Sequence, residues 1–193
     1  MKKIVFASSN PGKIEEIRSI LGKSYQVLGL KDINFNEEII ENGSTFEENA
    51  QIKADRIFEY TGLPCFADDS GLEVNCLNNA PSIYSARFAG EPSDSKKNNV
   101  LLLEKMKGEI DRSAQFVCVI CLKTKDNTLF FKGIVEGEIA ESMSGKEGFG
   151  YDPLFIPRSY TQTFADLGKE VKNKISHRKV ALNKLQTAID TIL

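Results

Sequence analysis

Two long apolar segments separated by a short polar turn constrain the fold most. Ala114–Lys123 and Thr128–Glu138 are both rich in β-branched and aromatic residues, and Lys125-Asp126-Asn127 lies between them. Strong β-formers on both sides of a short turn predict an antiparallel β-hairpin. The chain therefore contains a sheet, and the segments before and after the hairpin decide how that sheet is covered.

Strand-like and helix-like patterns alternate at the start of the chain. Lys3–Ala7 is apolar and predicts a strand. Asn10 is a favourable N-cap and Pro11 suits the first helical position, so a helix is expected from there to about Leu21. Tyr25–Leu30 predicts a second strand. This order of elements is typical of a mixed α/β fold.

Three further helices are predicted around the hairpin. Ser44-Thr45-Phe46-Glu47 has the pattern of a capping box and opens a helix that ends near Tyr60. Asp94–Lys107 is the second helix. Ser176 caps the third, whose apolar residues recur with helical spacing from Ala181 onward.

Two adjacent carboxylates, Asp68 and Asp69, follow an apolar run and precede Ser70-Gly71. This pattern predicts that a short strand, Cys65–Ala67, ends in a tight turn carrying both acids, and that a second strand starts at Leu72. Paired acids at a strand end can hold a divalent cation or orient a water molecule. The alternative is an ordinary solvated turn, because Asp and Ser favour turns.

Length and composition exclude several classes of protein. The chain has 193 residues, is 41% hydrophobic and has a formal net charge of −2. These values suit one domain, 1–193, built of two joined lobes, and they do not favour a nucleic-acid binder. The apolar stretch at the N-terminus is shorter than a secretory signal, and no apolar run approaches the ~20 residues of a membrane span. We expect a cytoplasmic protein that does not enter membranes.

The four cysteines are expected to be free thiols. Cys118 and Cys121 have C-x-x-C spacing, but they lie inside the first arm of the predicted hairpin. Residues three apart on a strand point to opposite faces, which disfavours a redox pair or a zinc site. Buried thiols in a reducing compartment are the preferred interpretation.

A candidate phosphate site joins the first strand to the first helix. It comprises Ser8, Ser9, Asn10, Pro11, Gly12 and Lys13. Free N–H groups at a helix N-terminus attract anions, and the helix dipole disfavours a cation there. Lys13 is therefore well placed if it faces a bound anion. The alternative is a lysine that points into water.

Gly148-Phe149-Gly150-Tyr151-Asp152-Pro153 is a candidate base-binding loop. Two glycines beside two aromatic residues form a loop that can lie against a flat ring. Stacking on a base contributes about 1–3 kcal/mol and does not discriminate between bases. The alternative is an ordinary turn whose aromatic residues belong to the core.

Lys172, His177 and Arg178 are candidates for reading the edge of a base. His177 and Arg178 fall in the first turn of the last helix, where the helix dipole disfavours cations. Lys and Arg side chains carry only donors, so they suit a 6-keto purine and oppose the 6-amino group of adenine. A lone histidine is otherwise more often structural or solvated.

Six segments, in this order, resemble the inosine/xanthosine triphosphate pyrophosphatases over nearly the whole chain. They are Ser8–Lys13, Thr45–Ala50, Phe66–Leu72, Ala80–Gly90, Gly148–Pro153 and Ile175–Arg178. The resemblance implies an elongated mixed β-sheet flanked by helices, with two lobes and a central active-site cleft. It also implies a homodimeric, magnesium-dependent hydrolase that converts ITP, dITP and XTP to the monophosphate and pyrophosphate.

The resemblance also implies roles for individual residues. Asp69 is the catalytic proton acceptor and a metal ligand, and Ser70 contacts substrate. The Ser8–Lys13 segment holds the phosphates. Phe149, Gly150, Tyr151 and Asp152 line the base and sugar pocket, and Lys172, His177 and Arg178 read the base. Relatives often have paired acids where this chain has Ile40-Glu41, so Glu41 is chosen as the second metal ligand, with Glu38 in reserve.

Two competing functions fit parts of the pattern. One is pyrophosphatase action on modified pyrimidine triphosphates, which a substrate panel would distinguish. The other is a nucleotide- or RNA-binding module without turnover. Adjacent acids beside a phosphate site argue against that module, because carboxylates repel phosphates unless a metal lies between them.

Overall fold

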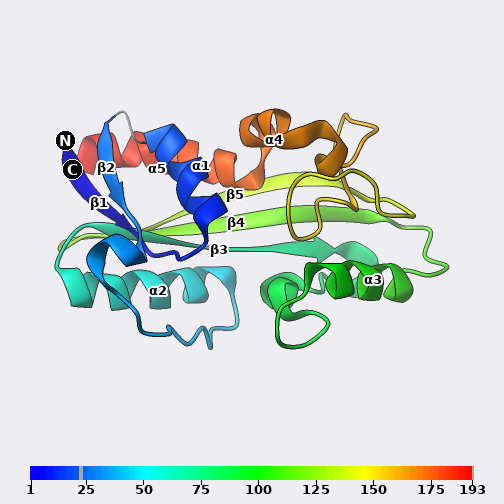
Figure 1. Ribbon diagram of the computed structural model, residues 1–193, viewed down its shortest axis with the longest axis horizontal. Helices are drawn as coiled ribbons and strands as arrows, with labels where there is room; N and C mark the ends of the chain where they lie inside the picture. Colours follow the sequence, from blue (N-terminus) through cyan, green and yellow to red (C-terminus); the bar gives the residue numbers. More distant parts are fainter. Residues whose placement is uncertain (22–23, 193) are drawn as a thin grey trace. The chain divides into compact units, whose positions relative to one another are not determined.

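The computed structural model describes residues 1–21 and 24–192. Helices flank a mixed sheet with the strand order β2-β1-β3-β4-β5-β6, so the predicted α/β class is confirmed (Figure 1). The strands are β1 Lys2–Phe6, β2 Tyr25–Leu28, β3 Cys65–Val74, β4 Ser113–Lys123, β5 Thr128–Ile139 and β6 Phe155–Pro157. The α-helices are α1 Pro11–Leu21, α2 Phe46–Thr61, α3 Ser95–Lys105, α4 Phe164–Ile175 and α5 His177–Ile192. Short 3₁₀ helices span Leu30–Ile33, Asn75–Leu77 and Ser82–Arg87.

The chain divides into two compact units. The first contains residues 1–69, 118–132 and 180–193, and the second contains residues 70–117 and 133–179. Strands β3, β4 and β5 each contribute residues to both units. Each unit has its own apolar core.

In the first unit, β1 runs parallel to both β2 and β3, with Ile4 opposite Val27 and Phe6 opposite Phe66. Helices α1 and α5 lie on one face of these strands and α2 lies on the other (Figure 1). Alternate strand residues pack against α1 and α5, because side chains on a strand point to opposite faces in turn. This core contains Ile4, Phe6, Ile17, Leu21, Phe66, Cys118, Ile120, Leu122, Ala181, Leu182, Leu185 and Ile189.

The predicted hairpin is confirmed, and its two arms are β4 and β5. The amide N–H of Thr124 donates to the carbonyl of Asn127 at 2.9 Å, which closes the turn. The N–H of Asn127 in turn donates to the hydroxyl of Thr124 at 3.0 Å. β4 has eleven residues and β5 has twelve, and the ten-residue strand β3 lies next to β4 in the sheet.

The second unit has a core rich in aromatic residues. Phe116, Phe155 and Phe164 form a cluster of rings with centroids 4.6–6.2 Å apart. β6 pairs antiparallel with β5, with Gly137 opposite Pro157. A Cβ atom at Gly137 would lie 2.2 Å from the carbonyl oxygen of Ile156, so only glycine allows this close approach.

Several predicted boundaries were wrong. The sequence did not predict β6, which has only three residues, or α4, which is interrupted at Gly168. The second strand ends at Leu28 instead of Leu30. The cap of α2 is Thr45, one residue after the predicted Ser44: the Thr45 hydroxyl accepts from the N–H of Glu48, and the Glu48 carboxylate accepts from the N–H of Ser44.

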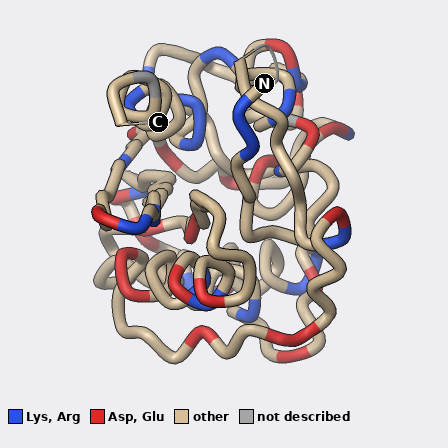
Figure 2. Tube along the Cα trace, turned by 90° about the vertical axis from the view of Figure 1, so that its left-hand side faces the viewer, with Lys and Arg blue, Asp and Glu red and all other residues tan. Residues whose placement is uncertain are grey.

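The surface carries both signs of charge, with lysines and arginines interspersed among aspartates and glutamates (Figure 2). All four cysteines are free; Cys65, Cys118 and Cys121 are buried and Cys76 is partly buried. No helix within residues 1–21 and 24–192 is long and apolar enough to cross a membrane.

Candidate active site

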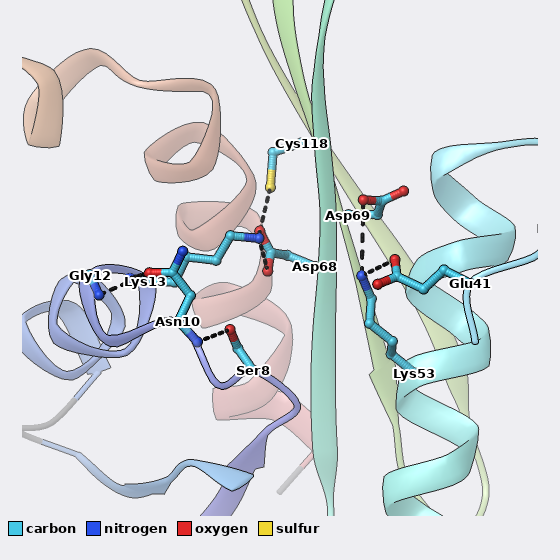
Figure 3. Close-up of polar contacts among 9 residues, drawn as sticks. All are labelled: Ser8, Asn10, Gly12, Lys13, Glu41, Lys53, Asp68, Asp69 and Cys118. Atoms are coloured by element: carbon cyan, nitrogen blue, oxygen red, sulfur yellow. Dashed lines mark hydrogen bonds and ion pairs between the residues drawn. The ribbon is translucent and has the colours of Figure 1, made fainter. Parts of the chain in front are cut away.

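Asp68 and Asp69 lie in the middle of a continuous strand. The sequence predicted a turn at this point, and that prediction was wrong, because β3 runs from Cys65 through both acids to Val74. Pairing with the long strand β4 overrides the turn preference of Asp, Ser and Gly. Adjacent residues on a strand point to opposite faces, and Figure 3 shows the two carboxylates on opposite sides of β3. The acids therefore belong to two different sets of contacts.

Asp68 binds Lys13 on the side of β3 that faces α1. The ammonium of Lys13 donates to both carboxylate oxygens of Asp68 at 2.9 Å (Figure 3). Asp68 is only 2% exposed, so its charge depends on this partner. The thiol of Cys118 lies 4.0 Å from the same carboxylate. The pair fixes Lys13 next to the start of α1.

The segment Ser8–Lys13 links the end of β1 to α1, as predicted. The side-chain oxygen of Asn10 accepts from the N–H groups of Gly12 and Lys13 at 3.0 and 3.2 Å, so Asn10 is the N-cap. The hydroxyl of Ser8 accepts from the N–H of Asn10 at 3.2 Å. These contacts hold the segment in one conformation beside the Lys13 ammonium, while Ser9, Asn10 and Pro11 stay exposed.

Asp69 faces α2, where Asn49 and Lys53 contact it. The amide of Asn49 donates to Asp69 Oδ2 at 3.2 Å, and the ammonium of Lys53 lies 3.9 Å from Oδ1. Burial raises the pKa of Asp69 above its usual value, the Lys53 charge lowers this pKa, and the nearby Glu41 raises it. A buried acid with a raised pKa is a common feature of catalytic sites.

Glu41 joins the same set through Lys53. The ammonium of Lys53 lies 2.5 Å from Glu41 Oε2, so the carboxylates of Glu41 and Asp69 converge on one cation (Figure 3). Glu38, the reserve candidate, is exposed. The part of the chain that the structure describes has no group of three or more His, Cys, Asp or Glu residues placed to hold a metal. Asp69 and Glu41 are the acids of this set that could hold a metal, together with oxygens from a ligand or water.

The sequence analysis missed Lys53 and Asn49. Both lie on α2, four residues apart, and therefore on one side of the helix. Ala50, Ala54 and Ile57 form the buried face of α2. A polar pair spaced by four residues beside an apolar stripe was the available signal, and it becomes informative once β3 is known to pack on that helix.

In the second unit, Phe149, Asp152 and Lys172 form one cluster. The carboxylate of Asp152 accepts from the backbone N–H of Phe149 at 2.8 Å and from the ammonium of Lys172 at 2.5 Å. The Lys172 ammonium lies 4.0 Å from the centre of the Phe149 ring, in cation–π contact. Phe149 remains 51% exposed, so much of its ring is open to a ligand.

The other predicted base-binding residues occupy different positions in this unit. His177 stacks on Phe116 with ring centres 4.8 Å apart, and Arg178 is 2% exposed. Both begin α5, and the Ser176 hydroxyl accepts from the N–H of Lys179, so the predicted cap is confirmed. Tyr151 is buried in the core, and its hydroxyl donates to the carbonyl of Ser85 at 2.8 Å. This placement gives Tyr151 a structural contact in the protein.

The remaining predicted residues occupy connecting positions. The carbonyl of Gly150 accepts from the amide of Asn99 at 2.8 Å, which ties the glycine-rich loop to α3. Ser70 follows Asp69 directly on β3 and is half-buried. The acidic and phosphate-binding candidates thus belong to the first unit, and Ser70 and the base-binding candidates to the second.

Comparisons with known proteins agree with the resemblance inferred from the sequence. Residues 4–188 match the model of the Ham1 family. The chain is 49% identical over 183 residues to the dITP/XTP pyrophosphatase of Christiangramia forsetii, covering 95% of this chain and 96% of that protein. It is 46% identical over 187 residues to the dITP/XTP pyrophosphatase of Porphyromonas gingivalis, covering 96% of each. The structure of the Staphylococcus aureus Ham1 protein superimposes with a TM-score of 0.92 at 45% identity and covers 100% of both chains. On these matches, and on the six sequence segments that predicted them, the chain belongs to the Ham1 family.

Proposed function

We propose that this protein hydrolyses ITP, dITP and XTP to the monophosphate and pyrophosphate, with water attacking the α-phosphorus. The observation that carries the proposal is the convergence of Asp69 and Glu41 on Lys53, because it gathers a partly buried acid, a second acid and a cation at one point. Membership of the Ham1 family supports the same reaction, since relatives at 46–49% identity are dITP/XTP pyrophosphatases.

Asp69 and Glu41 fit a magnesium ion. Mg²⁺ is usually held by one or two carboxylates together with substrate phosphates and water. The Lys53 ammonium lies within 3.9 Å of both carboxylates, so the two acids face a common space in which they would hold the ion together with oxygens from substrate and water. When bound, Mg²⁺ would neutralise charge on the phosphates and on the pyrophosphate leaving group.

The Ser8–Lys13 segment would bind the phosphates. An ammonium has three N–H donors, and Asp68 accepts from Lys13 through two oxygens. Lys13 can therefore keep its contact with Asp68 while it donates to a phosphate oxygen. Asp68 acts as the positioning residue in this arrangement, because it fixes the Lys13 ammonium at the start of α1.

Asp69 would orient the attacking water and accept its proton. Asn49 holds one carboxylate oxygen of Asp69 and Lys53 lies near the other, so the carboxylate cannot rotate freely. Burial raises the pKa of Asp69, which makes it a stronger base than an exposed aspartate.

The second unit would read the base. Phe149 offers an exposed ring for stacking, and Asp152 and Lys172 hold that ring and its loop. Lys172, His177 and Arg178 would donate to the 6-keto group of hypoxanthine or xanthine. Adenine carries a donor at that position, so ATP would be rejected.

The testing experiment is pyrophosphate release from ITP, XTP, dITP, ATP, GTP and dTTP, with magnesium and with excess EDTA. Magnesium-dependent release confined to ITP, XTP and dITP is the expected result. A modified pyrimidine triphosphate is tested beside this panel. Release from that compound, and not from the purines, would show that the substrates are modified pyrimidine triphosphates. Binding of ITP without release of pyrophosphate would indicate a nucleotide-binding module. In that case the proposed catalytic role of Asp69 would be wrong.

We also infer a cytoplasmic homodimer that does not bind nucleic acid. Light scattering coupled to size-exclusion chromatography tests whether the protein is a dimer. Cell fractionation tests its location. A gel-shift assay with single- and double-stranded nucleic acid tests whether it binds either one. A monomer at micromolar concentration would contradict the first inference.

A further inference from the structure

Helix α4 is interrupted directly before the turn that carries Lys172. Gly168 has φ 76° and ψ 172°, which is not helical, so Lys169–Ile175 forms a short helical segment of its own. The first N–H groups of a helical segment lack partners within it. Because φ is positive at Gly168, a larger residue would be strained there.

Glu147 supplies an acceptor for that segment. The backbone N–H of Lys169 donates to Glu147 Oε2 at 3.2 Å. A Cβ atom at Gly168 would lie 3.2 Å from the same oxygen, so the carboxylate lies directly against the interruption. A negative charge at this end also suits the dipole of the segment.

Glu147 belongs to the loop that carries Phe149 and Asp152. The neighbouring Gly145 and Gly148 both have positive φ, and a Cβ atom at Gly148 would lie 2.3 Å from Asp152 Oδ2. The loop is thus packed closely against its own Asp152. Glu147 lies inside this stretch and connects it to the first residue of the Lys172 segment.

The same loop and the same segment meet again at Lys172. The Lys172 ammonium contacts both the Asp152 carboxylate and the Phe149 ring. Two connections therefore join one loop to one helical segment, at Lys169 and at Lys172. The Glu147 contact thus adds a second connection between the loop and the segment, three residues before the one at Lys172.

We propose that Glu147 is a positioning residue for base recognition, acting through the Lys169 N–H to fix Lys172 over Phe149. This inference rests on the proposed function for the identity of the substrate. Glu147 itself need not touch the base. Its loss leaves the acidic and phosphate-binding residues of the first unit unchanged, so binding of the base should suffer more than the chemical step.

The experiment compares three variants with the wild type, using ITP and XTP at saturating magnesium. Glu147→Ala removes the acceptor, and we expect KM to rise about 3–10-fold with kcat within about twofold, in line with the usual effect of losing a helix cap. Glu147→Gln keeps an acceptor oxygen, so its KM should lie close to the wild-type value. Glu170→Ala is the matched control, because it removes an exposed acid from the same turn, and it should behave as wild type.

Amide hydrogen exchange of the substrate-free protein provides a readout that does not need turnover. Glu147→Ala should speed exchange at Lys169–Lys172, whereas Glu170→Ala should not. Unchanged KM together with unchanged exchange in Glu147→Ala overturns the inference, and so does an equal KM change in Glu170→Ala, which would mean that charge alone matters. A wild-type protein that releases no pyrophosphate would refute the proposed function, while the exchange result would still decide whether Glu147 fixes this segment.

Discussion

Asp68 and Asp69 are neighbours in sequence, but their carboxylates lie on opposite faces of β3. Asp68 contacts Lys13 of α1 at 2.9 Å, and Asp69 lies 3.2 Å from Asn49 of α2 (Figure 3). A single strand thus supports two sets of contacts that the sheet keeps apart. One set holds the Lys13 ammonium beside the start of α1. The other set holds the partly buried carboxylate of Asp69 near Glu41.

Asp69→Asn should lower turnover on the order of 10²-fold or more. The amide has nearly the same shape but cannot accept the proton of the attacking water. Pyrophosphate release from ITP, measured under single-turnover conditions, checks this. Asp68→Asn is the comparison, because it changes the neighbouring acid on the opposite face; near-normal turnover in Asp69→Asn would rule out its assigned role.

Lys13→Met should destabilise the fold more than Asp68→Asn does. The first change removes a cation that contacts both oxygens of the buried Asp68 carboxylate, which costs about 3 kcal/mol in comparable cases. The second leaves the Lys13 ammonium, whose side chain is 20% exposed and can be hydrated. Urea unfolding of both single variants and the double variant measures the difference.

The double variant Lys13→Met/Asp68→Asn should recover much of the stability that Lys13→Met loses. Equal losses in both single variants, with additive effects in the double variant, would contradict a dependence of Asp68 on Lys13.

Lys53→Met should move the acidic limb of the pH profile to higher pH. As the proposed proton acceptor, Asp69 has to be charged, so activity should fall as the pH drops through the pKa of Asp69. Burial raises that pKa and the charge of Lys53 lowers it, so removing Lys53 raises it further. The measurement is kcat/KM for ITP against pH at saturating magnesium, with Lys132→Met as a control lysine that pairs with Glu47. An acidic limb that stays in place or moves to lower pH would refute this coupling.

Arg178→Met should narrow the preference for ITP over ATP. Arg178 is buried, and methionine keeps much of its volume while removing the donors to a 6-keto group. The ratio of kcat/KM for the two substrates gives the result, and thermal unfolding reports any loss of packing. If the ratio is unchanged in a well-folded variant, base selection depends on other residues.

The sequence alone determined those elements whose signals are local. The β4–β5 hairpin follows from two β-rich arms and a polar turn. The start of α1 follows from Asn10 and Pro11, and the start of α5 follows from Ser176. The six motifs also identified the family before any fold was known. Caps and short turns depend on residues within a few positions of one another, which a sequence displays directly.

Only the tertiary structure decided which side chains meet. The turn preference of Asp68-Asp69-Ser70-Gly71 gave way to pairing with β4, and that pairing sent the two acids to opposite helices. Lys53 and Asn49 acquired their role because α2 packs on the Asp69 face. Glu147 acquired its contact because α4 breaks at Gly168, which no periodic pattern predicts. These contacts join residues distant in sequence, so they depend on which elements pack together and cannot be read from local preference.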